Sequence, residues 1–147
     1  MRILPICFLW LAAVACSSGE KANPLLEEAA SLYEQALSEE EALQPLLNSL
    51  EQQYNRLSVQ GRALTSAEQS FLENVSTLQV RYAQWREDRI EVPGFGHAHH
   101  HHDGHEHEHT HGKKMPEATP EHMLNIQRES LEGVLAMKAE AEALLKP

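Results

Sequence analysis

Cysteine, aromatic residues and basic residues are all scarce in this chain of 147 residues. It has two cysteines, its aromatic content is 5 %, and 12 lysines and arginines stand against 22 aspartates and glutamates. A net charge of −10 without a basic patch argues against nucleic acid as a partner. Seven glycines and seven prolines are too few for a collagen-like or broadly disordered chain. The length and the many helix-forming residues predict one small helical domain.

Catalytic motifs are scarce as well. The chain has no glycine-rich phosphate loop and no nucleophile elbow, and its carboxylates are spread along stretches with helical periodicity. Histidines in a flexible loop could not hold a general base on a rigid element. We therefore predict that the protein is not an enzyme.

Histidine, by contrast, is concentrated in one stretch, because nine of the ten histidines lie between His97 and His111. Neutral imidazole binds Zn²⁺, Ni²⁺ and Cu²⁺, and carboxylates add oxygen ligands. The predicted metal ligands are His97, His99, His100, His101, His102, Asp103, His105, Glu106, His107, Glu108, His109 and His111. We expect a divalent transition metal, with zinc favoured and nickel or copper as alternatives. A low-complexity spacer with incidental metal binding is the other interpretation.

The first 15 residues are typical of a secretion signal. Arg2 precedes an apolar run, residues 3–14, that is too short to span a bilayer. The run ends in Leu-Ala-Ala-Val-Ala before Cys16, which resembles the lipobox of bacterial lipoproteins, although Ala13 stands where that motif usually has leucine. The resemblance implies a signal peptide over residues 1–15 and an acylated Cys16. An ordinary signal peptide with an incidental cysteine is the alternative.

This resemblance also implies a location and a partner. A lipid on Cys16 would anchor the chain in the cell envelope, on the periplasmic or outer face of a bacterial membrane, and Ser17 favours the outer membrane. Signal cleavage removes Cys7, so the mature chain could form no intramolecular disulfide. Residues 16–23 would be the lipidated tether. An envelope protein is a possible second partner, and the oligomeric state stays open.

The longest stretch with helical periodicity is residues 24–58. Asn23 offers an N-cap and Pro24 suits the first helical position. Pro45 would remove one hydrogen bond inside this helix, yet the leucine spacing keeps its phase across it. We predict one long helix kinked near Pro45. Two collinear helices, the second capped by residues 38–41, are the alternative.

Two further helices are predicted. The second starts at a capping box formed by Thr65 and Glu68 and ends near Ile90, with residues 86–89 as a solvated charged end. The third starts at Thr119 and is rich in leucine and alanine. The predicted fold is an all-α, antiparallel three-helix up-down-up bundle over residues 24–147, with a disordered His-rich loop, residues 93–118, between the second and third helices.

Several of these features occur together in a group of small helical bacterial lipoproteins labelled after viral A-type inclusion proteins, which the chain resembles. The shared features are Cys16, Pro45 in the long first helix, Trp85 near the end of the second, and a Leu- and Ala-rich last helix. The resemblance implies a helical bundle and carries no activity. From the residues, we expect a lipid-anchored metal buffer, scavenger or chaperone. A structural or protein-interaction lipoprotein with the His-rich segment as a spacer is the alternative.

Overall fold

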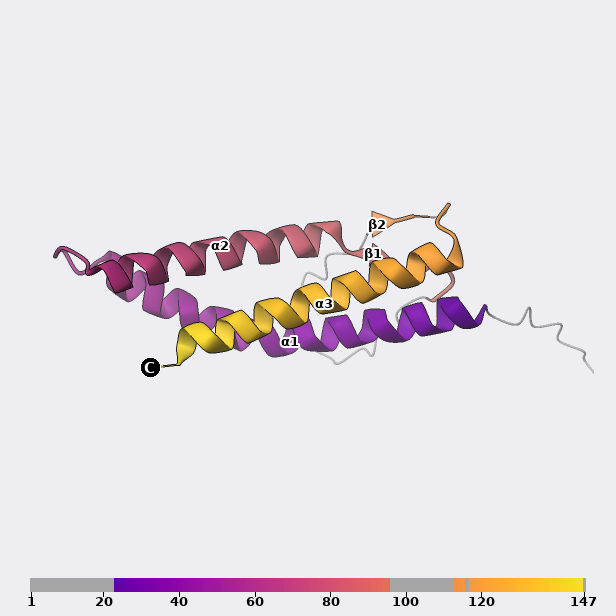
Figure 1. Ribbon diagram of the computed structural model, residues 1–147, viewed down its shortest axis with the longest axis horizontal. Helices are drawn as coiled ribbons and strands as arrows, with labels where there is room; N and C mark the ends of the chain where they lie inside the picture. Colours follow the sequence, from indigo (N-terminus) through magenta and orange to yellow (C-terminus); the bar gives the residue numbers. More distant parts are fainter. Residues whose placement is uncertain (1–22, 96–112, 116, 147) are drawn as a thin grey trace, which may run out of the picture.

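The computed structural model describes residues 23–95, 113–115 and 117–146, and most of them are helical. The elements in chain order are α1 (Pro24–Ser58), α2 (Ser66–Asp88), β1 (Ile90–Glu91), β2 (Lys113–Lys114) and α3 (Pro120–Leu145). Helix α3 packs mainly on α1, and α2 lies along the pair (Figure 1). The two strands lie beside the first half of α3. The prediction of a mostly helical protein is confirmed.

Each helix begins at the cap that the sequence predicts. Asn23 accepts a hydrogen bond at 2.9 Å from the backbone N–H two residues further on. Thr65 and Glu68 form a complete capping box, each side chain accepting from the backbone N–H of the other residue. Thr119 accepts from a backbone N–H three residues further on, at 3.2 Å. These bonds satisfy N–H groups that have no partner within the helix.

Pro45 does not interrupt α1, which runs unbroken from residue 24 to residue 58. A proline in a helix removes one hydrogen bond, but this one is exposed, while Leu43 and Leu47 are buried. The core contacts of the helix therefore continue past it. The axis of α1 changes direction about midway along its length (Figure 1). The prediction of one long helix is confirmed over that of two collinear helices.

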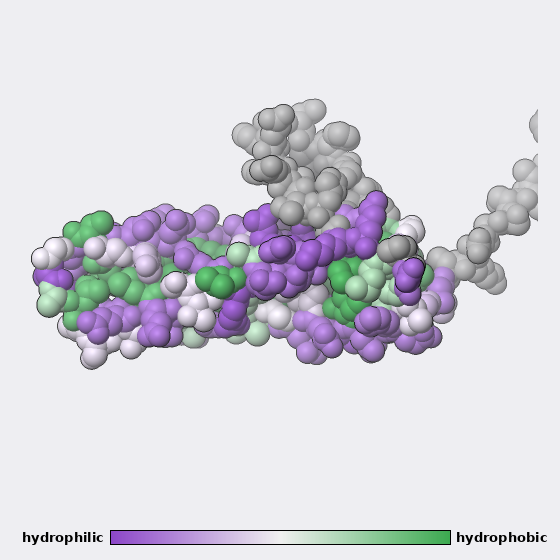
Figure 2. All heavy atoms as spheres, turned by 90° about the horizontal axis from the view of Figure 1, so that it is seen from above, coloured by the Kyte–Doolittle hydropathy of each residue, from purple (hydrophilic) through white to green (hydrophobic). Residues whose placement is uncertain are grey.

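Two apolar clusters form the core. The larger joins all three helices, and its buried members are Ala36, Leu43, Leu47, Leu50, Val75, Leu78, Val134, Met137 and Ala141. The smaller joins the first part of α1 to the start of α3, and its buried members are Ala29, Tyr33, Val92, Met123 and Leu124. Apolar side chains also reach the surface between rows of hydrophilic ones, toward the end away from the strands (Figure 2). None of the helices in the described ranges has the length and apolar character needed to cross a membrane.

Ion pairs join the helices at the surface. Three of them link α3 to its neighbours, with N–O distances of 2.6–2.7 Å: Glu28–Arg128 and Glu39–Lys138 to α1, and Arg81–Glu140 to α2. Exposed pairs of this kind contribute little stability each. They do show which parts of the helices lie opposite one another.

The structure adds two short strands to the mostly helical fold, and β2 lies within residues 93–118, which were predicted to be a loop. Strand β2 pairs in parallel with β1, so that Ile90 lies opposite Lys113 and Glu91 opposite Lys114. Helix α2 also ends at Asp88, two residues before the predicted end. Strands of two residues carry no period-2 pattern that a sequence could reveal.

Candidate metal-binding segment and its attachment to the bundle

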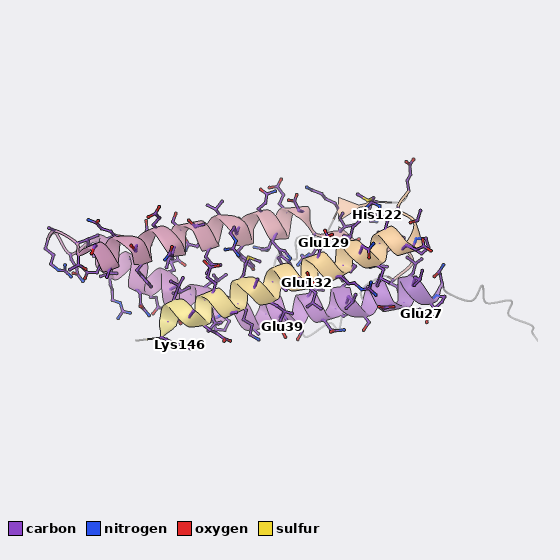
Figure 3. All side chains as sticks on the ribbon, in the orientation of Figure 1. Glu27, Glu39, His122, Glu129, Glu132 and Lys146 are labelled. Atoms are coloured by element: carbon purple, nitrogen blue, oxygen red, sulfur yellow. The ribbon has the colours of Figure 1, made fainter. Side chains whose placement is uncertain are left out.

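All twelve predicted metal ligands, from His97 to His111, lie outside the described residues, and so does Cys16. The predictions of metal ligation and of lipidation therefore stay predictions. Within the described ranges, no group of three or more His, Cys, Asp or Glu side chains is placed to hold a metal ion. The tenth histidine, His122, is exposed near the start of α3 (Figure 3).

The His-rich segment also contains a known zinc-binding sequence pattern that the prediction of its ligands did not use. The pattern His-Glu-x-x-His occurs twice, at residues 105–109 and 107–111. In zinc proteases this pattern works because a helix places both histidines on one face and the glutamate beside the metal. Both copies lie outside the described residues, and their histidines and glutamates are already among the twelve predicted metal ligands.

The described residues on both sides of the segment are held together. The backbone N–H of Lys113 donates to the carbonyl oxygen of Arg89 at 2.7 Å, within the pairing of β1 and β2. The Lys113 ammonium lies 3.0 Å from a carboxylate oxygen of Asp88 at the end of α2. Residues 90–91 and residues 113–114, which lie on either side of the His-rich segment in the sequence, are therefore neighbours in the structure.

Strand β1 is fixed to α3 by a buried amide. Gln127 is fully buried, and its Nε2 donates to the carbonyl oxygen of Ile90 at 2.8 Å. Its Oε1 has no hydrogen-bond partner among the described residues, although buried polar atoms are usually paired. The sequence gives no signal for this role, because a glutamine between apolar positions looks like an ordinary break in the apolar stripe.

The end of α2 is fixed to α1 by a partly buried carboxylate. Oε2 of Glu40 lies 2.6 Å from Nη1 of Arg89, and Oε1 lies 3.2 Å from Nε of Arg86. The Tyr82 hydroxyl donates to Oε1 at 2.8 Å and accepts from the amide of Gln44. The side chains of Glu40 and Arg89 are 14 % and 7 % exposed. The Glu40 carboxylate thus contacts three side chains at the end of α2, just before β1.

This arrangement corrects the prediction of a solvated charged end at residues 86–89. Arg89 is buried, and its guanidinium also lies 5.8 Å from the ring centroid of Trp85. Its carboxylate partner is 49 residues away in the chain, so the spacing of local charges could not reveal it. A buried arginine needs such a partner, because desolvating an unpaired charge is costly.

Two phenols near this carboxylate, those of Tyr33 and Tyr82, have raised pKa values and stay neutral. Burial raises the pKa of Tyr82, and the hydrogen bond to Glu40 raises it further. Burial likewise raises the pKa of Tyr33, against the opposing charge of Arg89. Tyr82 can therefore keep donating to Glu40 at any pH near neutrality.

The residues that follow β1 pack at the end of the bundle where α1 begins. Val92 is 4 % exposed and belongs to the smaller apolar cluster, against which Phe95 also packs. Between them Gly94 has φ 83°, a conformation that glycine adopts without strain. The backbone N–H of Phe95 donates to the carbonyl oxygen of Val92 at 3.3 Å and closes this turn. Residues 92–95, which precede the His-rich segment, therefore pack against the bundle.

Comparison with protein-family models, with curated proteins and with solved structures found no match for this chain. The resemblance to small helical lipoproteins thus stays a prediction from the sequence.

Proposed function

We propose that this chain is a lipid-anchored cell-envelope protein that binds a divalent transition metal through its His-rich segment, as a buffer, scavenger or chaperone. One observation carries the proposal: residues 97–111 hold nine histidines and three carboxylates. Zinc suits these donors in a tetrahedral shell, so about two or three ions per chain would use them fully. Nickel and copper accept the same donors, and copper binds such sites more tightly than zinc.

The attachment of the segment supports this role. Because β1 and β2 are paired, the residues on either side of the His-rich segment, 90–91 and 113–114, already lie side by side. Closing a flexible loop costs entropy that grows slowly with its length. Here the fold of the bundle supplies that closure before any metal binds. Ligands from the beginning and the end of the segment can therefore share one ion more readily than in a free peptide.

The helix contacts support the up-down-up topology. The two ion pairs between α1 and α3, Glu28–Arg128 and Glu39–Lys138, follow the same order along both helices, as expected for parallel helices. Between α2 and α3 the order is reversed, as expected for antiparallel helices: Arg81 pairs with Glu140, and Trp85 donates to the carbonyl oxygen of Ser130. We take the His-rich segment as the long connection between the second and third helices of this bundle.

This topology has a consequence for the membrane. A tether over residues 16–23 would reach at most roughly 25 Å. With the lipid on Cys16, the start of α1 would lie near the membrane, and Val92 and Phe95 pack at that same end. The metal-binding segment would then begin on the membrane side of the bundle. That position suits the transfer of metal to or from a membrane protein, in the outer membrane if Ser17 directs sorting.

The proposal is tested by metal titration of the full chain. We expect a variant with the nine histidines of residues 97–111 replaced by glutamine to lose binding of Zn²⁺, measured by calorimetry. His122→Gln is the matched control and should bind as the unchanged chain does, because His122 lies on α3. Equal binding by the nine-histidine variant would contradict the proposal, and so would a single tight site.

The alternative function is a protein-interaction lipoprotein with the segment as a spacer. It is favoured by the apolar side chains that reach the surface between the hydrophilic ones (Figure 2). Growth of cells under metal excess and metal starvation separates the two functions. A phenotype of the nine-histidine variant supports metal handling, whereas an unchanged phenotype supports the spacer.

A further inference from the structure

An open groove of about 420 Å³ lies between the second half of α2 and the middle of α3. Its apolar lining comes from Trp85, Ile126 and Met137, and its polar lining includes Glu129 of α3 (Figure 3). The volume falls in the range of ligand pockets, roughly 300 to 1,000 Å³. The groove belongs to the helices, so it is independent of the proposed metal function.

The indole of Trp85, on α2, approaches Gly133 of α3 in this groove. A Cβ on Gly133 would lie in van der Waals contact with the indole, 3.4 Å from its Cδ1. The indole Nε1 donates to the carbonyl oxygen of Ser130 at 2.9 Å, which fixes the ring against α3. The side chain is nevertheless only partly buried. It therefore offers a fixed aromatic surface to the groove.

The charges that line the groove are balanced except for one. Arg81 pairs with Glu140 at 2.6 Å, and Arg89 pairs with Glu40 at 2.6 Å. The other two lining charges are carboxylates. Asp88 has the ammonium of Lys113 at 3.0 Å, whereas no ion pair joins Glu129 to any residue of the described ranges. Among the residues that the structure describes, the groove thus presents one carboxylate without an ion pair beside an apolar wall.

We propose that this groove binds a small organic cation with an aromatic or aliphatic body. The body covers Trp85, Ile126 and Met137, and its ammonium group lies at Glu129. Contact of the apolar body with Trp85 and attraction of the ammonium group by Glu129 favour the two parts of such a ligand. An organic anion is disfavoured, because both lining arginines already hold carboxylates and a free carboxylate would repel it.

The test uses three probes of similar shape: 2-phenylethylammonium, the neutral 2-phenylethanol and the anionic 3-phenylpropionate. NMR follows the indole N–H resonance of Trp85 in the full chain, identified by its loss in Trp85→Phe. We expect the cation to shift this resonance with the highest affinity, the alcohol to bind more weakly and the anion to bind most weakly. The proposal is overturned if the anion binds as tightly as the cation, or if none of the probes moves the resonance.

A pair of variants on one helix isolates the carboxylate. Glu129→Gln should weaken binding of 2-phenylethylammonium about two- to fivefold, the size of a solvent-exposed ion pair, and leave the alcohol unaffected. The matched control is Glu132→Gln, because Glu132 is also exposed on α3 but does not line the groove (Figure 3). An equal loss of affinity in both variants, or no loss in Glu129→Gln, would refute the role of Glu129. Circular dichroism of both variants should be unchanged, since both residues are exposed.

Discussion

At the scale of single residues, Glu40 joins α1 to the end of α2. Its carboxylate contacts Tyr82, Arg86 and Arg89, and the last of these is buried. A well-packed apolar core would be at least as stable as a buried ion pair, but removing one partner of an existing pair leaves a buried charge behind. The stability of the junction between α1 and α2 should therefore depend on this one side chain.

We expect Glu40→Gln to lower the free energy of unfolding by about 3 kcal/mol, because Arg89 keeps its charge and loses its carboxylate. Urea unfolding followed by circular dichroism measures the change. Glu41→Gln is the matched control, since Glu41 is the next residue on α1 and is exposed. It should change stability by less than about 0.5 kcal/mol. Similar stabilities for the two variants would show that the buried pair contributes nothing.

The capping box of α2 predicts a dependence on pH. The hydrogen bond from Arg62, followed by those from Thr65, lowers the pKa of Glu68 from 4.5 to about 2. A carboxyl whose pKa is lowered by folding stabilises the fold fully above its unfolded pKa, and this contribution is lost as the pH falls through the folded value. The relevant window is therefore about pH 4.5 down to pH 2.

We expect Glu68→Gln to have a lower melting temperature than the unchanged chain near neutral pH, with the difference vanishing at about pH 2. Thermal unfolding at several pH values measures it. Glu73→Gln, an exposed change on the same helix, should show no such pH-dependent difference. A gap between Glu68→Gln and the unchanged chain that persists at about pH 2 would mean that the capping box is not its cause.

At the scale of elements, the sequence predicts the helices well because many residues repeat the same signal. The cap at Thr65 and the periodic apolar positions define α2 to within two residues of its observed end. Strands β1 and β2 are two residues each and lie on either side of the His-rich segment, so no local pattern reveals their pairing. The contacts of Gln127 and Arg89 also depend on distant residues. The candidate metal ligands, by contrast, are a prediction from the sequence alone.

Pro45 provides a test at the level of α1. A proline inside a helix is less favourable than alanine by about 3 kcal/mol, part of which the bend of the helix relieves. Because Pro45 is exposed and the buried leucines lie on the opposite face, Pro45→Ala should keep the core and raise the free energy of unfolding by about 1 kcal/mol or more. Chemical denaturation measures this change. A less stable Pro45→Ala would mean that packing requires the proline.

At the scale of the whole molecule, the bundle and the metal-binding segment should behave as separable parts. Both apolar clusters consist of residues outside 97–111. Structural zinc domains unfold when the metal is removed, because their ligands hold the core together. The buried clusters of the described residues join all three helices, so we expect that folding does not require metal.

We therefore expect a strong chelator to leave the helical circular dichroism signal of the chain unchanged. Added Zn²⁺ should raise the melting temperature, because a ligand that binds the folded state more tightly stabilises it. The chelated nine-histidine variant should melt at the same temperature as the chelated unchanged chain. Loss of most helicity on chelation would show instead that metal is part of the fold.

The most direct test of the proposed function is the metal content of the chain isolated from its own cell envelope, without a metal-affinity step. Elemental mass spectrometry gives the number of zinc, nickel and copper ions per chain. We predict about two or three ions, with zinc most abundant, and their release when the pH falls below the ordinary pKa of histidine, near 6.5. A chain isolated without any of these metals, although they are present in the growth medium, would contradict it.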